Sequence, residues 1–100
     1  MVALDFGNGT VLDYNVSTVN NTAYGFLLVA CNSSNANLTV KVSIDARYGI
    51  FVDSIGGLAT REVNGTYLYW SFWVDGVYGT TASDRAVIEE GQHLEWKYGP

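Results

Sequence analysis

The sequence predicts an α+β domain in which a mixed sheet of about five strands covers one short helix. Several segments alternate between apolar and polar residues, which is typical of strands with one buried face. A single segment, residues 22–31, combines helical spacing with a polar start. The order along the 100 residues, two strands, then the helix, then further strands, is the α+β order.

The first two strands are predicted to form a hairpin. Residues 2–6 alternate as a short strand, and the Asn-Gly pair within residues 7–10 is a strong hairpin-turn signal. The return strand is expected at about residues 11–18. The helix over residues 22–31 follows, because polar capping residues precede apolar side chains spaced i, i+3, i+4 and i+7. These apolar residues are Ala23, Phe26, Leu27 and Ala30.

Two further strands are expected after the helix, within residues 38–55. Residues 38–45 alternate strictly, with Leu38, Val40, Val42 and Ile44 on one face. Residues 48–55 form another extended segment, closed by Gly56-Gly57. We expect a loop from about residue 58 to residue 66, because turn-forming residues interrupt the apolar pattern there.

The segment at residues 67–74 is the densest apolar run in the chain and is predicted to be the central strand. Successive strand side chains face opposite sides of a sheet, so this segment presents two faces. The core face is expected to hold Leu68, Trp70, Phe72 and Val74. The other face, with rings that carry polar tips, is expected to be partly exposed and holds Tyr67, Tyr69, Ser71 and Trp73.

Asp75-Gly76 ends the central strand in a tight turn, and residues 77–83 are expected to be irregular. Ser83-Asp84-Arg85 is interpreted as the polar part of a loop. The last strand, about residues 93–98, turns Leu94, Trp96 and Tyr98 inward. One helix and one mixed sheet are combined most economically as a β-grasp, in which the sheet wraps the helix. Residues 1–100 are therefore expected to be a single β-grasp domain of a longer secreted or surface protein.

The composition excludes several classes of protein. A hydrophobic fraction of 48% with 14% aromatic residues is incompatible with a disordered chain. The net charge is −5 and the sequence holds no cluster of Lys and Arg, so the main attraction to nucleic acid is missing. No apolar run approaches the roughly 20 residues of a membrane helix, so no transmembrane segment is expected in this chain.

Six N-x-S/T sequons are present, more than chance placement of these residue types would give. The excess favours a secreted or cell-surface glycoprotein. The alternative is that Asn, Ser and Thr cluster because all three favour turns. The candidate glycosylation sites are Asn8, Asn15, Asn20, Asn32, Asn37 and Asn64.

The sequence does not predict catalysis. Its single cysteine, Cys31, lacks a basic neighbour in sequence and is interpreted as a small buried hydrophobe. Its single histidine, His93, is expected on the outward face of the last strand beside Glu95. No further His or Cys stands at metal-ligand spacing, so we predict a non-enzyme with no cofactor and no metal.

The aromatic side chains are the best candidates for a functional surface. Exposed rings stack on flat or apolar ligands, on sugars or on a partner protein. The alternative is that a neighbouring domain of the same protein covers the face. Tyr67, Tyr69 and Trp73 share the outer face of the central strand, and Tyr48, Phe51 and Tyr78 are expected to extend it.

Three motifs carry a family resemblance that covers nearly the whole chain. Residues 48–58, YGIFVDSIGGL, resemble the pattern yG-x-[FY]-V-x-S-I-x-G, and residues 69–76, YWSFWVDG, resemble YW-x-[FY]-x-V-[ND]-G. Residues 90–98, EGQHLEWKY, resemble the closing pattern dGD-x-[IVL]-x-W-x-[YF]. These patterns are similar to those of the DUF4430 domains and of the C-terminal β-grasp domain of the transcobalamin and intrinsic-factor cobalamin carriers.

The resemblance implies a β-grasp module, often one that binds a ligand or is appended to a surface protein. Two departures from the pattern are Gln92, where the family usually has Asp, and a short helix that contains Gly25. In the carriers this domain covers one face of cobalamin together with a helical domain, so cobalamin is implied by resemblance only. We expect a non-catalytic module that acts in ligand binding or assembly. The alternative is a corrinoid-type binding domain that needs a partner domain.

Overall fold

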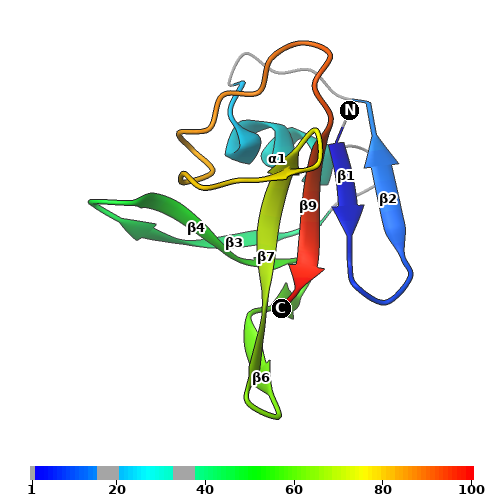
Figure 1. The fold of residues 1–100 in the computed structure, drawn as a ribbon, viewed down its shortest axis with the longest axis vertical. Helices are drawn as coiled ribbons and strands as arrows, with labels where there is room; N and C mark the ends of the chain where they lie inside the picture. Colours follow the sequence, from blue (N-terminus) through cyan, green and yellow to red (C-terminus); the bar gives the residue numbers. More distant parts are fainter. Residues whose placement is uncertain (1, 16–20, 33–37) are drawn as a thin grey trace.

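A computed structural model describes residues 2–15, 21–32 and 38–100 (Figure 1). One α-helix and nine strands follow one another in these residues. The first half contains β1 (Val2–Asp5), β2 (Val11–Tyr14), α1 (Ala23–Cys31), β3 (Val40–Asp45) and β4 (Gly49–Ile55). The second half contains β5 (Leu58–Ala59), β6 (Arg61–Val63), β7 (Thr66–Val74), β8 (Val77–Tyr78) and β9 (Leu94–Gly99).

The main sheet has six strands in the order β2-β1-β9-β7-β6, with β8 paired to β7. The first and last strands, β1 and β9, lie parallel at its centre, with Val2 opposite Leu94 and Leu4 opposite Trp96. The other pairs in this sheet are antiparallel. A parallel pair needs a long crossover connection. Here the connection contains the helix and the second sheet, and Figure 1 shows both behind the main sheet.

The second sheet has three strands in the order β3-β4-β5. The α+β class and the short helix are confirmed, whereas the sheet of about five strands is in fact a six-stranded sheet and a separate smaller one. Gly56 and Gly57, at φ 60° and 85°, reverse the chain so that β5 pairs back onto β4. β3 and β4 do not pair with the main sheet, and their hairpin crosses behind β7 (Figure 1).

The core lies between the two sheets and the helix. Of the residues predicted on the core face of the central strand, Trp70 and Phe72 are 3% and 7% exposed, whereas Leu68 and Val74 are only partly buried. The Trp70 indole donates to the carbonyl of Leu58 at 2.8 Å, and the Tyr98 hydroxyl donates to that of Ala59 at 2.7 Å. These two bonds join the sheets while satisfying the buried polar groups.

The helix begins at its predicted signal. The Thr22 hydroxyl oxygen caps α1 by accepting from the N–H of Gly25 at 3.0 Å. The Trp96 indole lies beneath it and donates to the carbonyl of Ala23 at 3.4 Å. No helix in the described ranges is long and apolar enough to span a membrane.

Two segments predicted as loops contain strands. Within residues 58–66 lie β5 and β6, because Asn64 and Gly65, at φ 52° and 81°, make a turn that pairs β6 with β7. Within residues 77–83, β8 folds back onto β7. The return strand predicted at residues 11–18 ends at Tyr14, and residues 16–18 lie outside the described part of the chain.

Candidate aromatic binding site

Three of the predicted ligand-binding residues gather on the outer face of the main sheet. Asp75 and Gly76, at φ 49° and 82°, turn β8 back so that Tyr78 pairs with Trp73 across the strands. Their ring centroids are 5.2 Å apart at an interplanar angle of 81°, an edge-to-face contact. Burial raises the pKa of Tyr78, and the nearby Tyr69 hydroxyl, which shares a hydrogen bond with it, raises it further. We call Tyr69, Trp73 and Tyr78 the aromatic face.

Polar groups hold the indole of the aromatic face in place. Trp73 donates from Nε1 to the Ser71 hydroxyl at 3.2 Å, and that hydroxyl donates to the Lys97 carbonyl at 3.5 Å. The Lys97 ammonium lies 4.8 Å from the Trp73 ring centroid, within cation–π range. Glu95 lies 3.7 Å from that ammonium and 3.9 Å from the imidazole of His93. The ring is therefore fixed in orientation and bordered by charge along β9.

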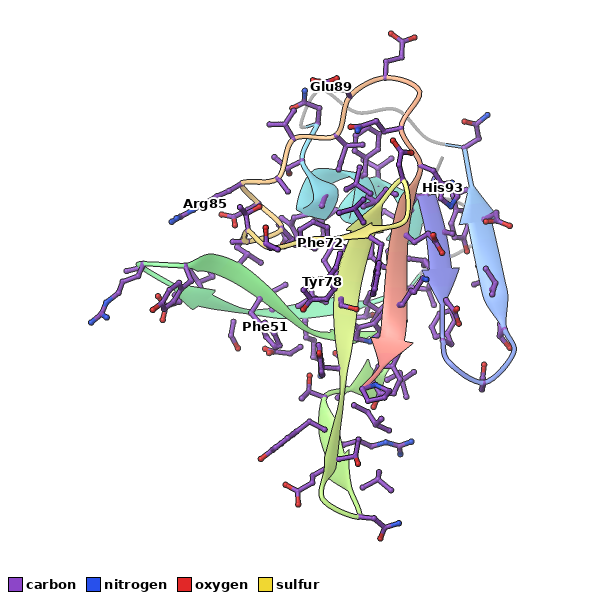
Figure 2. The ribbon with its side chains drawn as sticks, viewed as in Figure 1. Phe51, Phe72, Tyr78, Arg85, Glu89 and His93 are labelled. Carbon is purple, nitrogen blue, oxygen red and sulfur yellow. The ribbon has the colours of Figure 1, made fainter. Side chains whose placement is uncertain are left out.

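Phe51 extends the aromatic face from the second sheet. Its side chain on β4 is 48% exposed and, with Tyr69 and Tyr78, lines a small pocket of about 140 Å³. Phe51 and Tyr78 are labelled in Figure 2. Gly79 forms part of the same wall and lies directly against the Phe72 ring, which an added Cβ would strike. The chain can pass this close to the Phe72 ring only because residue 79 has no side chain.

The other two predicted ring residues lie apart from this group. Tyr48, 70% exposed, lies at the tip of the β3–β4 hairpin and lines a wider cleft of about 480 Å³ with Phe51. Tyr67, 62% exposed, pairs with Glu62 in the β6–β7 hairpin, which projects from the main body in Figure 1. Period-2 alternation assigned Tyr67 to the outer face, but it could not show that the strand extends beyond the body of the domain.

The candidate glycosylation sites that the structure describes are all exposed. Asn8 lies in the β1–β2 turn, where its side-chain oxygen accepts from the N–H of Thr10 at 3.1 Å. Asn64 lies in the β6–β7 turn, and Asn15 and Asn32 follow β2 and α1. Asn20 and Asn37 lie outside the described residues.

Residues 83–85, which the sequence pattern indicates to be a polar loop, have a structural role. Ser83 is buried, and its hydroxyl donates to the Ile50 carbonyl at 3.2 Å. Asp84 accepts from the Ile50 N–H at 3.0 Å, and Arg85 donates to the Arg47 carbonyl at 3.0 Å. These contacts hold the long β8–β9 connection against the β3–β4 hairpin. We call residues 83–85 the clamp. The signal in the sequence that could have indicated it is the glycine at position 49, where an added Cβ would meet Asp84.

The single cysteine lies in the core, and the single histidine lies beside the Asp75 turn. Cys31 is 1% exposed, and burial raises the pKa of its thiol to about 11. Asp75 accepts from the backbone N–H of His93 at 2.8 Å and from the Gln92 amide at 3.5 Å, which supports the turn beside the aromatic face. Within the described ranges, no three His, Cys, Asp or Glu side chains are placed to hold a metal ion.

Comparison with known proteins shows the family. The model of the domain of unknown function DUF4430 matches residues 18–100, and the chain belongs to this family. The fold is similar to the crystal structure of a "putative metal binding protein" from Ruminococcus gnavus ATCC 29149, with a TM-score of 0.73 and 18% identity. The match covers 97% of this chain and 91% of that one. No curated protein matches the sequence.

Proposed function

We propose that this domain is a non-catalytic binding module of a secreted or surface glycoprotein, and that its aromatic face makes the contact. One observation carries the proposal: three aromatic side chains from two adjacent strands converge on the outer face of the main sheet. Tyr78 is still 46% exposed there, with Phe51 beside it at 48%. Rings that are fixed in place lose little conformational entropy on binding, so they suit stacking on a flat ligand, a sugar ring or a partner surface.

The shape of the site favours weak binding by the isolated domain. The aromatic face is one wall, and the pocket next to it, about 140 Å³, is small for a whole ligand. Association costs about 4–15 kcal/mol of lost freedom, which a single wall offsets only in part. We expect dissociation constants of about 0.1–1 mM, near −4 to −5.5 kcal/mol. A second domain that covers the same ligand would tighten binding.

A second candidate follows from this need for a covering domain. The ββα order, with β1 and β9 parallel at the centre of the sheet, supports a β-grasp arrangement like that of the cobalamin carriers. In that case the aromatic face would form one wall for a corrinoid and a partner domain the other. The domain by itself would then bind cobalamin weakly or not at all.

Ligand titration monitored through tryptophan emission tests the proposal. Simple glycans and cobalamin are added to the domain, with correction for light absorbed by the ligand. A ligand on the aromatic face should quench the emission of Trp73, and Trp73→Ala should abolish that change. Tyr67→Ala is the matched control, because Tyr67 is exposed on the same strand but outside the site. If millimolar ligand leaves the emission and the amide shifts unchanged, small-molecule binding by the isolated domain is wrong.

A further inference from the structure

A second concave surface lies between the tip of the β3–β4 hairpin and the β8–β9 connection. It is a cleft of about 480 Å³. Figure 2 shows Arg85 descending from the connection on one side and Phe51 on the strand below. The residues that matter for its chemistry are Asp45, Arg47, Tyr48, Phe51 and Arg85. Its volume suits a small molecule, in contrast with the narrow pocket beside the aromatic face.

Hydrogen bonds between the clamp and β4 hold the walls of this cleft in place. Ile50 on β4 is bonded on both sides, since its carbonyl accepts from Ser83 and its N–H donates to Asp84. The Ser83 carbonyl in turn accepts from the N–H of Tyr24 on α1 at 2.9 Å. The clamp therefore connects both walls to the body of the domain. The cleft is open before any ligand arrives, which lowers the ordering cost of binding.

The charges in the cleft favour a carboxylate. The chain has only five Lys and Arg against ten Asp and Glu, yet two of its arginines, Arg47 and Arg85, line this one cleft. Neither guanidinium forms an ion pair with an acidic side chain of the described ranges. The Asp45 carboxylate is engaged by the hairpin turn, where Oδ1 accepts from the N–H of Arg47 at 2.7 Å and of Tyr48 at 3.1 Å.

We propose that this cleft binds a small molecule in which a flat apolar ring carries a carboxylate. The ring would lie against Tyr48 and Phe51, both exposed, and the carboxylate would meet the guanidiniums of Arg47 and Arg85. A guanidinium presents paired N–H donors that match the two oxygens of a carboxylate. Arg85 uses Nη1 for the Arg47 carbonyl and keeps its other donors for the ligand. This cleft shares Phe51 with the pocket beside the aromatic face but contains none of Tyr69, Trp73 and Tyr78, and it goes beyond the function proposed above.

Amide chemical shifts of the isotope-labelled domain test the site with three probes. Benzoate carries both the ring and the carboxylate, benzyl alcohol only the ring, and acetate only the carboxylate. Benzoate should shift the amides of residues 45–51 and 80–85 with a lower dissociation constant than either other probe. Equal affinity for benzoate and benzyl alcohol would overturn the role of the arginines. Shifts confined to the aromatic face would overturn the site itself.

Three matched variants separate the cleft from general charge effects. Arg47→Gln and Arg85→Gln should each weaken benzoate binding about two- to fivefold, as loss of one exposed ion pair does. Arg61→Gln removes the same charge from the exposed strand β6 and should leave the affinity unchanged. Arg47→Gln is the decisive variant, because Arg85→Gln also removes a hydrogen bond that supports the fold. An Arg47→Gln affinity equal to that of the unaltered domain would overturn the proposal.

One more variant distinguishes binding in the cleft from binding at the aromatic face. Trp73→Ala removes the centre of the aromatic face but no residue of the cleft. Benzoate should bind this variant as it binds the unaltered domain. A loss of benzoate binding on Trp73→Ala would show that the probe occupies the aromatic face and would contradict a separate site.

Discussion

Trp70 and Trp73 stand three positions apart on β7 and lie on opposite faces of the sheet. Trp70 packs edge-to-face against Phe6, with centroids 5.4 Å apart, and its indole is bonded to the second sheet. Trp70→Ala should therefore cost about 3–5 kcal/mol of the free energy of unfolding, as aromatic truncation in a core does. Trp73→Ala should cost about 1 kcal/mol, mainly from the lost ring and cation–π contacts. Urea denaturation of both variants gives the two values.

Trp70→Phe serves as a control for that comparison. It retains most of the apolar volume but leaves the Leu58 carbonyl without its donor, so an intermediate loss is expected. If Trp73→Ala is as damaging as Trp70→Ala, the outer face is also part of the core. The aromatic face would then be structural.

The thiol of Cys31 should be unreactive in the folded domain. Its pKa is raised to about 11 by burial, against about 8.5 for a free thiol, so little thiolate forms at pH 8. Alkylation by iodoacetamide at pH 8 should be at least about 100-fold slower in the native domain than in urea. Since the folded state disfavours the thiolate, this group's contribution to stability is complete below about pH 8.5 and is lost as the pH rises toward 11. Native alkylation at the rate seen in urea would contradict the burial.

The β3–β4 hairpin depends on Gly49 for its approach to the clamp. An added Cβ would meet the Asp84 carboxylate and, at 2.8 Å, the Cβ of Ala82, in a backbone conformation with φ 100°. Gly9 has a similar φ of 91° but nothing within 4 Å. Both Gly→Ala changes carry the cost of positive φ, and Gly49→Ala should cost about 1–3 kcal/mol more than Gly9→Ala. Thermal or urea unfolding of the pair measures the difference, and equal losses would mean that the clamp tolerates displacement.

Alternation and capping were sufficient to locate most elements. The cores of β3, β4, β7 and β9 and the helix were predicted to within one or two residues at most ends. The short strands β5, β6 and β8 were missed, because two or three residues give no measurable period and pair only through the glycine-containing turns around them. Local patterns also could not show that β3 and β4 leave the main sheet, since strand partners are set by long-range packing.

The candidate site was predictable only where local patterns determine it. Tyr69 and Trp73 follow from the period-2 pattern, and Tyr78 joins them because the Asp75-Gly76 turn brings β8 back. The position of Phe51 beside them depends on how the second sheet crosses β7. The clamp and the two arginines of the cleft depend on contacts between residues more than 30 positions apart, such as Ile50 with Asp84. No local sequence pattern reports such contacts.

The whole molecule offers several exposed positions for glycans. Asn8, Asn15, Asn32 and Asn64 all lie in turns or at the ends of elements, where a glycan can extend into solvent. If the protein is secreted or displayed, intact-mass measurement on material from its natural source should show mass increments of sugar, which glycosidase treatment removes. An unmodified mass from that source would remove the main argument for an external location.

The binding role of the outer face can be tested through the three indole N–H signals of the domain. Trp70 and Trp96 are buried and donate to the backbone carbonyls of Leu58 and Ala23, whereas Trp73 donates to Ser71 on the outer face. A glycan or corrinoid that binds as proposed should shift the Trp73 indole signal in ¹⁵N-resolved spectra and leave the other two unchanged. Saturable movement of the Trp73 signal with a dissociation constant of about 0.1–1 mM is the predicted result. A ligand that binds without shifting the Trp73 signal would contradict binding through the aromatic face.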